Sequence, residues 1–90
     1  MMKRVQVIYS GQVQGVGFRY TVKEAASGYE IGGFVKNLTN GDVEVVAEAQ
    51  EPDITRFLAD IETEMGRFIE SRSLSWDRAT GEFDGFSVRY

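Results

Sequence analysis

The chain contains neither cysteine nor histidine among its 90 residues. Without cysteine it has no disulfide and no thiol nucleophile. Without histidine it lacks the usual general base near neutral pH, so Ser-His and Cys-His nucleophile pairs are excluded. Zinc and copper sites also depend mainly on these two residue types. We therefore expect no metal and no cofactor, and any catalysis must rest on positioning, electrostatics or a carboxylate.

Long apolar runs are absent too. No stretch of about 18 apolar residues occurs, so we expect no membrane span and no membrane partner. The segment from Met1 to Ser10 is too short and too polar for the apolar part of a secretory signal, so the cytoplasm is the expected location. With 42% apolar and 27% charged residues, the composition is typical of a globular protein. The length predicts one domain over residues 1–90, which we expect to be a monomer.

The charge is low and unevenly divided. A net charge of −4 disfavours a nucleic-acid partner. Residues 1–41 hold five basic and two acidic side chains (net +3), whereas residues 42–90 hold five basic and twelve acidic ones (net −7). The candidate anion-binding residues described below all lie in the positive half. Surface variation in a small protein would explain the asymmetry equally well.

Apolar periodicity and turn signals predict seven regular elements, five strands and two helices. An Asn40-Gly41 turn is predicted to join the second and third strands. The second helix begins at Pro52 and can end at Gly66. Its apolar stripe consists of Ile54, Phe57, Leu58, Ile61 and Met65. The predicted strands are Arg4–Ser10, Gly32–Leu38, Asp42–Ala49, Glu70–Arg78 and Phe86–Tyr90, and the first helix is Arg19–Gly28, with Tyr20, Val22, Ala25 and Ala26 near helical spacing.

This order of elements predicts an α+β fold. Two βαβ-type units give a ferredoxin-like βαββαβ sandwich, with the fourth strand and the last strand close together. An antiparallel sheet is expected to carry the two helices on one face, while its other face can stay in contact with water.

The loop between the first strand and the first helix is the strongest candidate for a binding site. It reads Gly11-Gln12-Val13-Gln14-Gly15-Val16-Gly17-Phe18-Arg19. Its glycines allow tight turns that leave backbone N–H groups free to bind an anion. A Walker A loop is excluded because no Gly-Lys-Ser/Thr follows, and a dinucleotide fingerprint is excluded because Tyr20 stands where glycine is needed. A plain glycine-rich turn remains the alternative.

Two polar side chains could act with this loop. Arg19 falls in the first helical turn, where a cation opposes the helix dipole, and a bound anion would remove that conflict. Asn37 lies near the end of a strand that leads into a tight hairpin. Its amide can accept and donate hydrogen bonds, which suits a residue that orients water. On local grounds, Arg19 could instead point into solvent and Asn37 could cap a turn.

Together, the two segments resemble the acylphosphatase family. The matching stretches are Ser10–Tyr20, Gly32–Leu38 and Gly41–Glu48, and the resemblance covers nearly the whole chain. The segment from Met65 to Trp76 departs from the family pattern, which often has a Gly-Pro turn and a valine-rich strand there.

The resemblance implies a function and a set of site residues. It implies a ferredoxin-like enzyme that hydrolyses acyl phosphates, with inorganic phosphate as product or inhibitor. It also implies that Arg19 binds the phosphate and Asn37 orients the attacking water. The phosphate cradle would be the backbone N–H groups of Gly15, Val16, Gly17, Phe18 and Arg19.

Other functions remain open on the sequence alone. The same fold could bind phosphate or an acyl phosphate without turnover. Gly33-Phe34-Val35 echoes part of an RNA-binding signature, but the full motif is missing. Glu62 and Glu64 could be considered as a metal or acid–base pair. At a spacing of two residues on a helix, however, they point in different directions and are better explained as a solvated surface.

Overall fold

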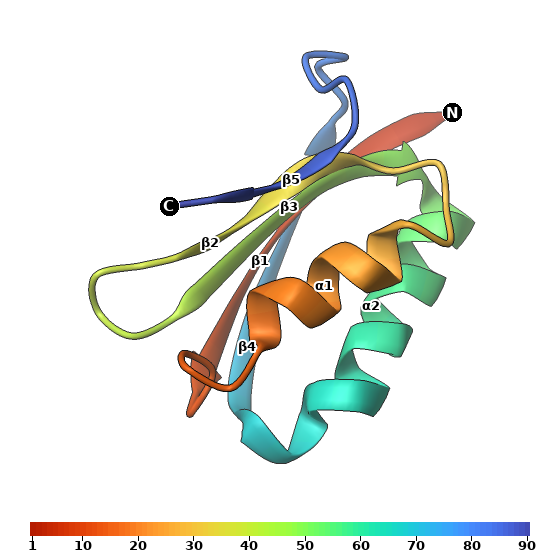
Figure 1. The fold of residues 1–90 in the computed structure, drawn as a ribbon. Helices are drawn as coiled ribbons and strands as arrows, with labels where there is room; N and C mark the ends of the chain where they lie inside the picture. The colour runs from red at the N-terminus through yellow and green to blue at the C-terminus, as the bar shows by residue number, and fades with distance from the viewer.

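A single five-stranded sheet with both helices packed on one face forms the fold, described here over residues 1–90 from a computed structural model (Figure 1). Every predicted element is present, and the observed ends lie within two residues of the predicted ones. The elements are β1 (Met2–Gly11), α1 (Phe18–Ala26), β2 (Gly32–Asn37), β3 (Val43–Gln50), α2 (Glu51–Met65), the short 3₁₀ helix η1 (Gly66–Phe68), β4 (Ile69–Arg78) and β5 (Phe86–Arg89).

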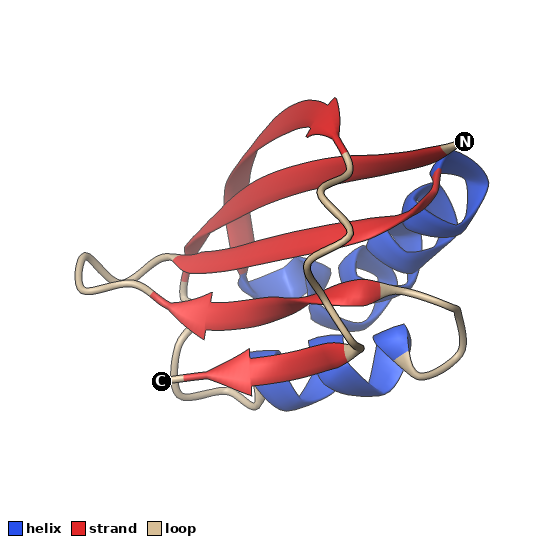
Figure 2. Cartoon of the chain, turned by 90° about the horizontal axis from the view of Figure 1, so that it is seen from above, coloured by secondary structure: helices blue, strands red, loops and turns tan.

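The strand order is β4-β1-β3-β2-β5, which corrects two details of the prediction. The sheet is mixed rather than wholly antiparallel, because β5 pairs parallel to β2. The fourth and last strands lie at opposite edges of the sheet rather than close together. The connection between them, residues 79–85, crosses the sheet (Figure 2). A chain that reverses after β4 runs parallel to β2 when it reaches the far edge.

The core between sheet and helices follows the predicted alternation. Alternate residues of β1 and β3 are fully buried, and the whole apolar stripe of α2 is buried as well. The strand residues are Val5, Val7, Tyr9, Val43, Val45, Ala47 and Ala49. One helical assignment was wrong, because Tyr20 is 69% exposed. Helix α1 instead buries Phe18, Val22 and Ala26, which are four residues apart and share one face. Tyr20 lies two residues from Phe18, on a different side of the helix.

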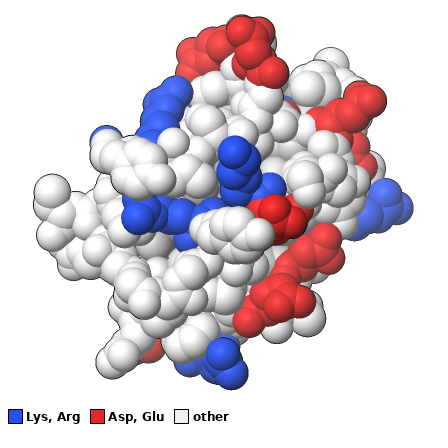
Figure 3. Space-filling model, viewed as in Figure 1, with Lys and Arg blue, Asp and Glu red and all other residues white.

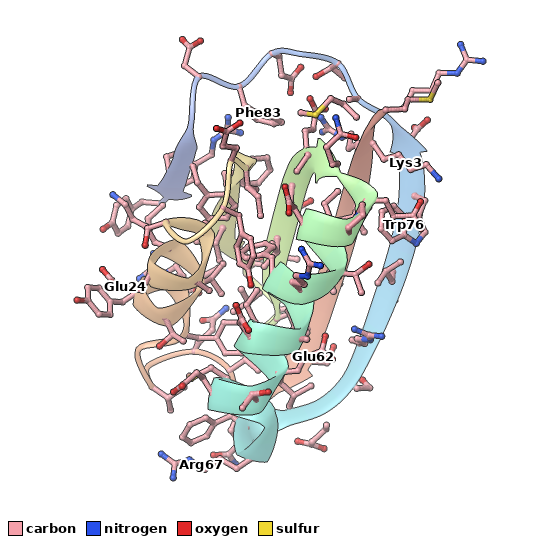
Figure 4. The ribbon with its side chains drawn as sticks, turned by 90° about the vertical axis from the view of Figure 1, so that its right-hand side faces the viewer. Lys3, Glu24, Glu62, Arg67, Trp76 and Phe83 are labelled. Atoms are coloured by element: carbon pink, nitrogen blue, oxygen red, sulfur yellow. The ribbon has the colours of Figure 1, made fainter.

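The face of the sheet opposite the helices is partly covered, where the sequence had suggested that it stays wet. We call the crossing segment, residues 79–85, the strap. Under it, Val46 is 1% and Glu48 3% exposed. Phe83 of the strap packs on Phe34 of β2, with ring centroids 6.0 Å apart, and lies above the sheet in Figure 4. The strap thus gives the small domain a second apolar contact layer.

A buried carboxylate anchors the strap to the sheet. Glu48 accepts hydrogen bonds from the Thr80 amide at 2.8 Å, the Thr80 hydroxyl at 2.9 Å and the Gly81 amide at 2.9 Å. Arg4, its neighbour across the β1–β3 pair, donates to it at 3.0 Å. Burial alone would raise the pKa of Glu48, but these hydrogen bonds outweigh it and hold the pKa below its ordinary value.

Replacing this carboxylate should destabilise the fold in a pH-dependent way. We expect Glu48→Gln to lower the free energy of unfolding by about 2–3 kcal/mol at pH 7, because a carboxamide leaves some of the buried donors unpaired. A depressed folded-state pKa stabilises above the unfolded pKa, and that stabilisation is lost as pH falls through the folded value. Urea unfolding at several pH values should therefore show the variant and the parent converging in acid.

The matched control is Glu44→Gln, on the same strand and the same face of the sheet. Glu44 accepts an exposed hydrogen bond from Gln6, so its replacement should change stability by less than about 1 kcal/mol. An equal loss in both variants would show that the strap does not depend on the buried carboxylate.

Candidate functional site

The ends of three strands meet the beginning of α1 at one end of the sheet. Strands β1 and β2 are parallel to each other because each pairs antiparallel to β3, and β5 is parallel to β2. Their carboxyl ends therefore lie together, on the left in Figure 1. A cavity of about 260 Å³ opens there, lined by Val13, Gly15, Gly17, Phe18, Arg19, Tyr20, Lys23, Asn37, Val88 and Tyr90.

The loop between β1 and α1 offers unpaired backbone donors to this cavity. Gly15 and Gly17 have φ angles of +78° and +80°, a left-handed conformation that glycine adopts without strain. Gly17 is the N-cap of α1, which has neither a capping side chain nor an acidic residue in its first turn. No turn, loop or cap hydrogen bond is donated by a backbone amide from residues 13–20. The first N–H groups of a helix also lack acceptors within it.

Hydrophobic packing fixes where this loop ends and the helix begins. The Phe18 ring is 2% exposed and lies 5.4 Å from the ring of Tyr9. The Tyr9 hydroxyl donates to Glu62 at 3.0 Å, and Glu62 also pairs with Arg72. Burial and the nearby Glu62 carboxylate raise the pKa of Tyr9, so this hydroxyl stays protonated at neutral pH. Phe18 therefore anchors the start of α1 through its side chain.

Among the predicted cradle residues, Val16 stands apart. Gly15, Gly17, Phe18 and Arg19 line the cavity, whereas Val16 does not. Its partly buried side chain packs against the hydrophobic core. Any role of Val16 in binding would be limited to its backbone amide.

Arg19 lies in the cavity with most of its donors uncommitted. Its guanidinium stacks 4.8 Å from the centroid of the Tyr90 ring, which restrains the side chain. One long hydrogen bond, 3.5 Å, runs from its Nη1 to the carbonyl of Arg89. No acidic side chain pairs with Arg19. The cavity therefore holds a positive charge without a protein counter-ion.

Asn37 lines the same cavity and carries an unpartnered polar atom. It is the last residue of β2, and its Oδ1 is buried without a hydrogen-bond donor. A buried acceptor left unpaired costs stability, which makes it informative about a site. The structure thus brings Arg19 and Asn37, 18 positions apart in the sequence, to one cavity.

A side chain that the sequence analysis did not single out holds the two parts together. The Gln14 amide in the loop donates to the carbonyls of Leu38, at 2.8 Å, and Asp42, at 2.9 Å. Both carbonyls belong to the β2–β3 connection, and Leu38 follows Asn37 directly. This bridge fixes the spacing between the loop amides and Asn37.

The sequence analysis also missed several lining residues, namely Lys23, Tyr20, Val88 and Tyr90. The spacing of four between Arg19 and Lys23 was a usable signal, since such residues share a helix face.

Glu62, considered above beside Glu64, forms the Tyr9 and Arg72 contacts instead. No group of three or more acidic side chains is arranged to hold a metal ion, and no helix is long and apolar enough to cross a membrane.

Comparisons with known proteins identify relatives of this chain. The acylphosphatase family model matches residues 5–88. An acylphosphatase from Syntrophus aciditrophicus is 37% identical over 91 residues, covering 100% of this chain and 95% of its relative. One from Methanospirillum hungatei is 44% identical over 73 residues, covering 81% of this chain and 80% of its relative.

The fold matches a solved structure over almost its full length. The crystal structure of acylphosphatase from Bacillus subtilis superposes with a TM-score of 0.88 at 30% identity, covering 98% of this chain and 99% of that one. The chain therefore belongs to the acylphosphatase family, whose members are hydrolases that act on acyl phosphates.

Proposed function

We propose that residues 1–90, acting as a single acylphosphatase-like domain, hydrolyse acyl phosphates to a carboxylate and inorganic phosphate. In this proposal Arg19 and the amides of Gly15 to Arg19 hold the phosphoryl group, and Asn37 orients the attacking water. The observation that carries it is the meeting of Arg19 and Asn37 at one cavity, with the Oδ1 of Asn37 buried and without a donor. A site that binds phosphate without turnover has no need of such an acceptor.

The binding part of the proposal follows from the charges of the cavity. An acyl phosphate brings a doubly charged phosphoryl group, and the free amides at the N-terminus of α1 point their positive ends toward it. Arg19 can add two parallel hydrogen bonds through its planar guanidinium. Each charge-assisted hydrogen bond contributes roughly 1.5–3 kcal/mol. The phosphate would also offset the unfavourable position of Arg19 in the first helical turn.

The chemical step needs little beyond this arrangement. Water held by Asn37 Oδ1 attacks phosphorus in line, the bond from phosphorus to the acyl oxygen breaks, and its electron pair leaves with the carboxylate. Holding the reactants in place can remove about 7–11 kcal/mol of the barrier. Since the chain has no histidine, we infer that a phosphoryl oxygen of the substrate accepts the proton from water. Phosphoryl transfer of this kind depends mainly on positioning and electrostatic stabilisation.

Hydrolysis of benzoyl phosphate is the direct test. We expect turnover of benzoyl phosphate, negligible turnover of p-nitrophenyl phosphate at equal concentration, and competitive inhibition by inorganic phosphate. p-Nitrophenolate is a poorer leaving group than benzoate, so this monoester needs more stabilisation of its transition state than the acyl phosphate does. Phosphate binding without any benzoyl phosphate turnover would contradict the proposal and favour the non-catalytic binding module.

A further inference from the structure

We propose that Lys23 forms a subsite for the acyl group and favours acyl phosphates whose acyl part carries a second negative charge, such as a carboxylate. The inference rests on the proposed function, because it assigns the part of the cavity beyond the phosphoryl group. Lys23 lines that cavity together with Arg19. It lies one helical turn further along α1, roughly 6 Å from Arg19 along the helix axis.

The charge of Lys23 is not neutralised within the protein. It takes part in no ion pair, and no hydrogen bond is donated by its side chain. By contrast, Lys3 pairs with Glu51 at 2.6 Å. Figure 3 shows basic side chains on the left and in the centre of the face that carries α1, with others at its right edge and bottom, and acidic side chains at its top, on its right and beside the central basic ones. Lys23 therefore adds a second cation to the cavity that Arg19 lines.

The direction of the cavity places the acyl group near Lys23. The loop amides and Asn37 lie at the level where α1 begins, because β2 ends beside the loop that Gln14 ties to it. Lys23 is further from that end, in the second turn of α1. A phosphoryl group bound at the helix N-terminus would leave Lys23 beside the acyl part. Tyr20 and Val88 supply apolar contacts for the rest of that group.

A cation in the last turn of α1 also suits the helix dipole, which gives Lys23 a purely structural explanation. The two explanations differ in their consequences. The dipole contribution affects stability and is the same whichever substrate is bound. A subsite changes the preference between substrates that differ only in the charge of the acyl group.

The experiment compares benzoyl phosphate with its 3-carboxy and 4-carboxy derivatives, and uses the ratio of kcat/KM for the better carboxy substrate to that for benzoyl phosphate. We expect Lys23→Gln to lower this ratio about threefold to fivefold, the effect of one partly exposed charge pair. Lys23→Glu should lower it further, by about tenfold, because attraction becomes repulsion. The inhibition constant of inorganic phosphate should change less than the ratio does.

Lys3→Gln is the matched control, because it removes the same charge outside the cavity. Lys3 lies across the molecule from α1 (Figure 4). Its ratio should equal that of the parent, and an equal fall in both variants would attribute the preference to overall charge. An unchanged ratio in Lys23→Gln would overturn the subsite. If kcat/KM then fell equally on all three substrates, Lys23 would act on the phosphoryl group instead. Absence of turnover in the parent would instead remove the proposed function itself.

Discussion

Arg19→Lys is expected to remove nearly all hydrolysis of acyl phosphates, with kcat/KM falling by about 10³-fold or more, the scale seen when an arginine that stabilises a transferring phosphoryl group is lost. The variant keeps the charge but loses the planar fork that can hold two phosphoryl oxygens at once. It also loses the flat surface that stacks on the Tyr90 ring at 4.8 Å. Steady-state kinetics with benzoyl phosphate measure the loss, and the inhibition constant of inorganic phosphate should rise in parallel.

The control is Arg67→Lys, the same substitution at an exposed position in η1 that does not line the cavity. Arg67 stacks on the Phe68 ring at 4.7 Å, so both variants lose a comparable aromatic contact. We expect Arg67→Lys to retain the parent kcat/KM. If Arg19→Lys kept more than half of the parent kcat/KM, bidentate binding of the phosphoryl group by Arg19 would be wrong.

The elements of this fold could be predicted because their signals are local. The inward valines of β1 and β3 and the stripe of α2 lie at the spacing that one buried face demands, and all of them are buried. Asn40-Gly41 marks the turn between β2 and β3, where Gly41 adopts a φ of +98°. Each of these features depends on residues within a few positions of one another.

Most of the errors concern contacts between residues that are far apart in the sequence. Glu48 resembles any outward-facing strand residue, and nothing nearby shows that Thr80 and Gly81 will cover it. The position and direction of β5 depend on that same strap, because the strap carries the chain to the far edge of the sheet. Tyr20 was misplaced because its spacing fits a helix pattern that Phe18 and Val22 occupy better.

The candidate site divides in the same way. Arg19 and Asn37 were identified from their local motifs, and their meeting follows from the parallel arrangement of β1 and β2. Gln14 could not be identified, because its partners are carbonyl groups, which every residue carries. Lys23 was missed although its spacing from Arg19 pointed to the same helix face. A search for polar residues four positions after a site residue would have found it.

Asn37→Ala tests the orientation of water separately from the binding of phosphate. We expect kcat to fall by about 10²–10³-fold, the usual cost of removing one preorganised polar group from an active site. The inhibition constant of inorganic phosphate should change little, because the loop amides and Arg19 are untouched. The control is Asn40→Ala, at the only other asparagine, whose side chain bonds Asp42 within the hairpin and does not line the cavity. It should keep the parent kcat.

The two substitutions should therefore separate two kinetic constants. Arg19→Lys should weaken inhibition by phosphate as well as turnover, whereas Asn37→Ala should reduce turnover alone. A variant of Asn37 that bound phosphate as poorly as it turned over substrate would make Asn37 a ligand of the phosphoryl group. Full kcat in Asn37→Ala would remove the residue from the mechanism. In that case its buried, unpaired Oδ1 would be only a local cost of ending β2 at the cavity.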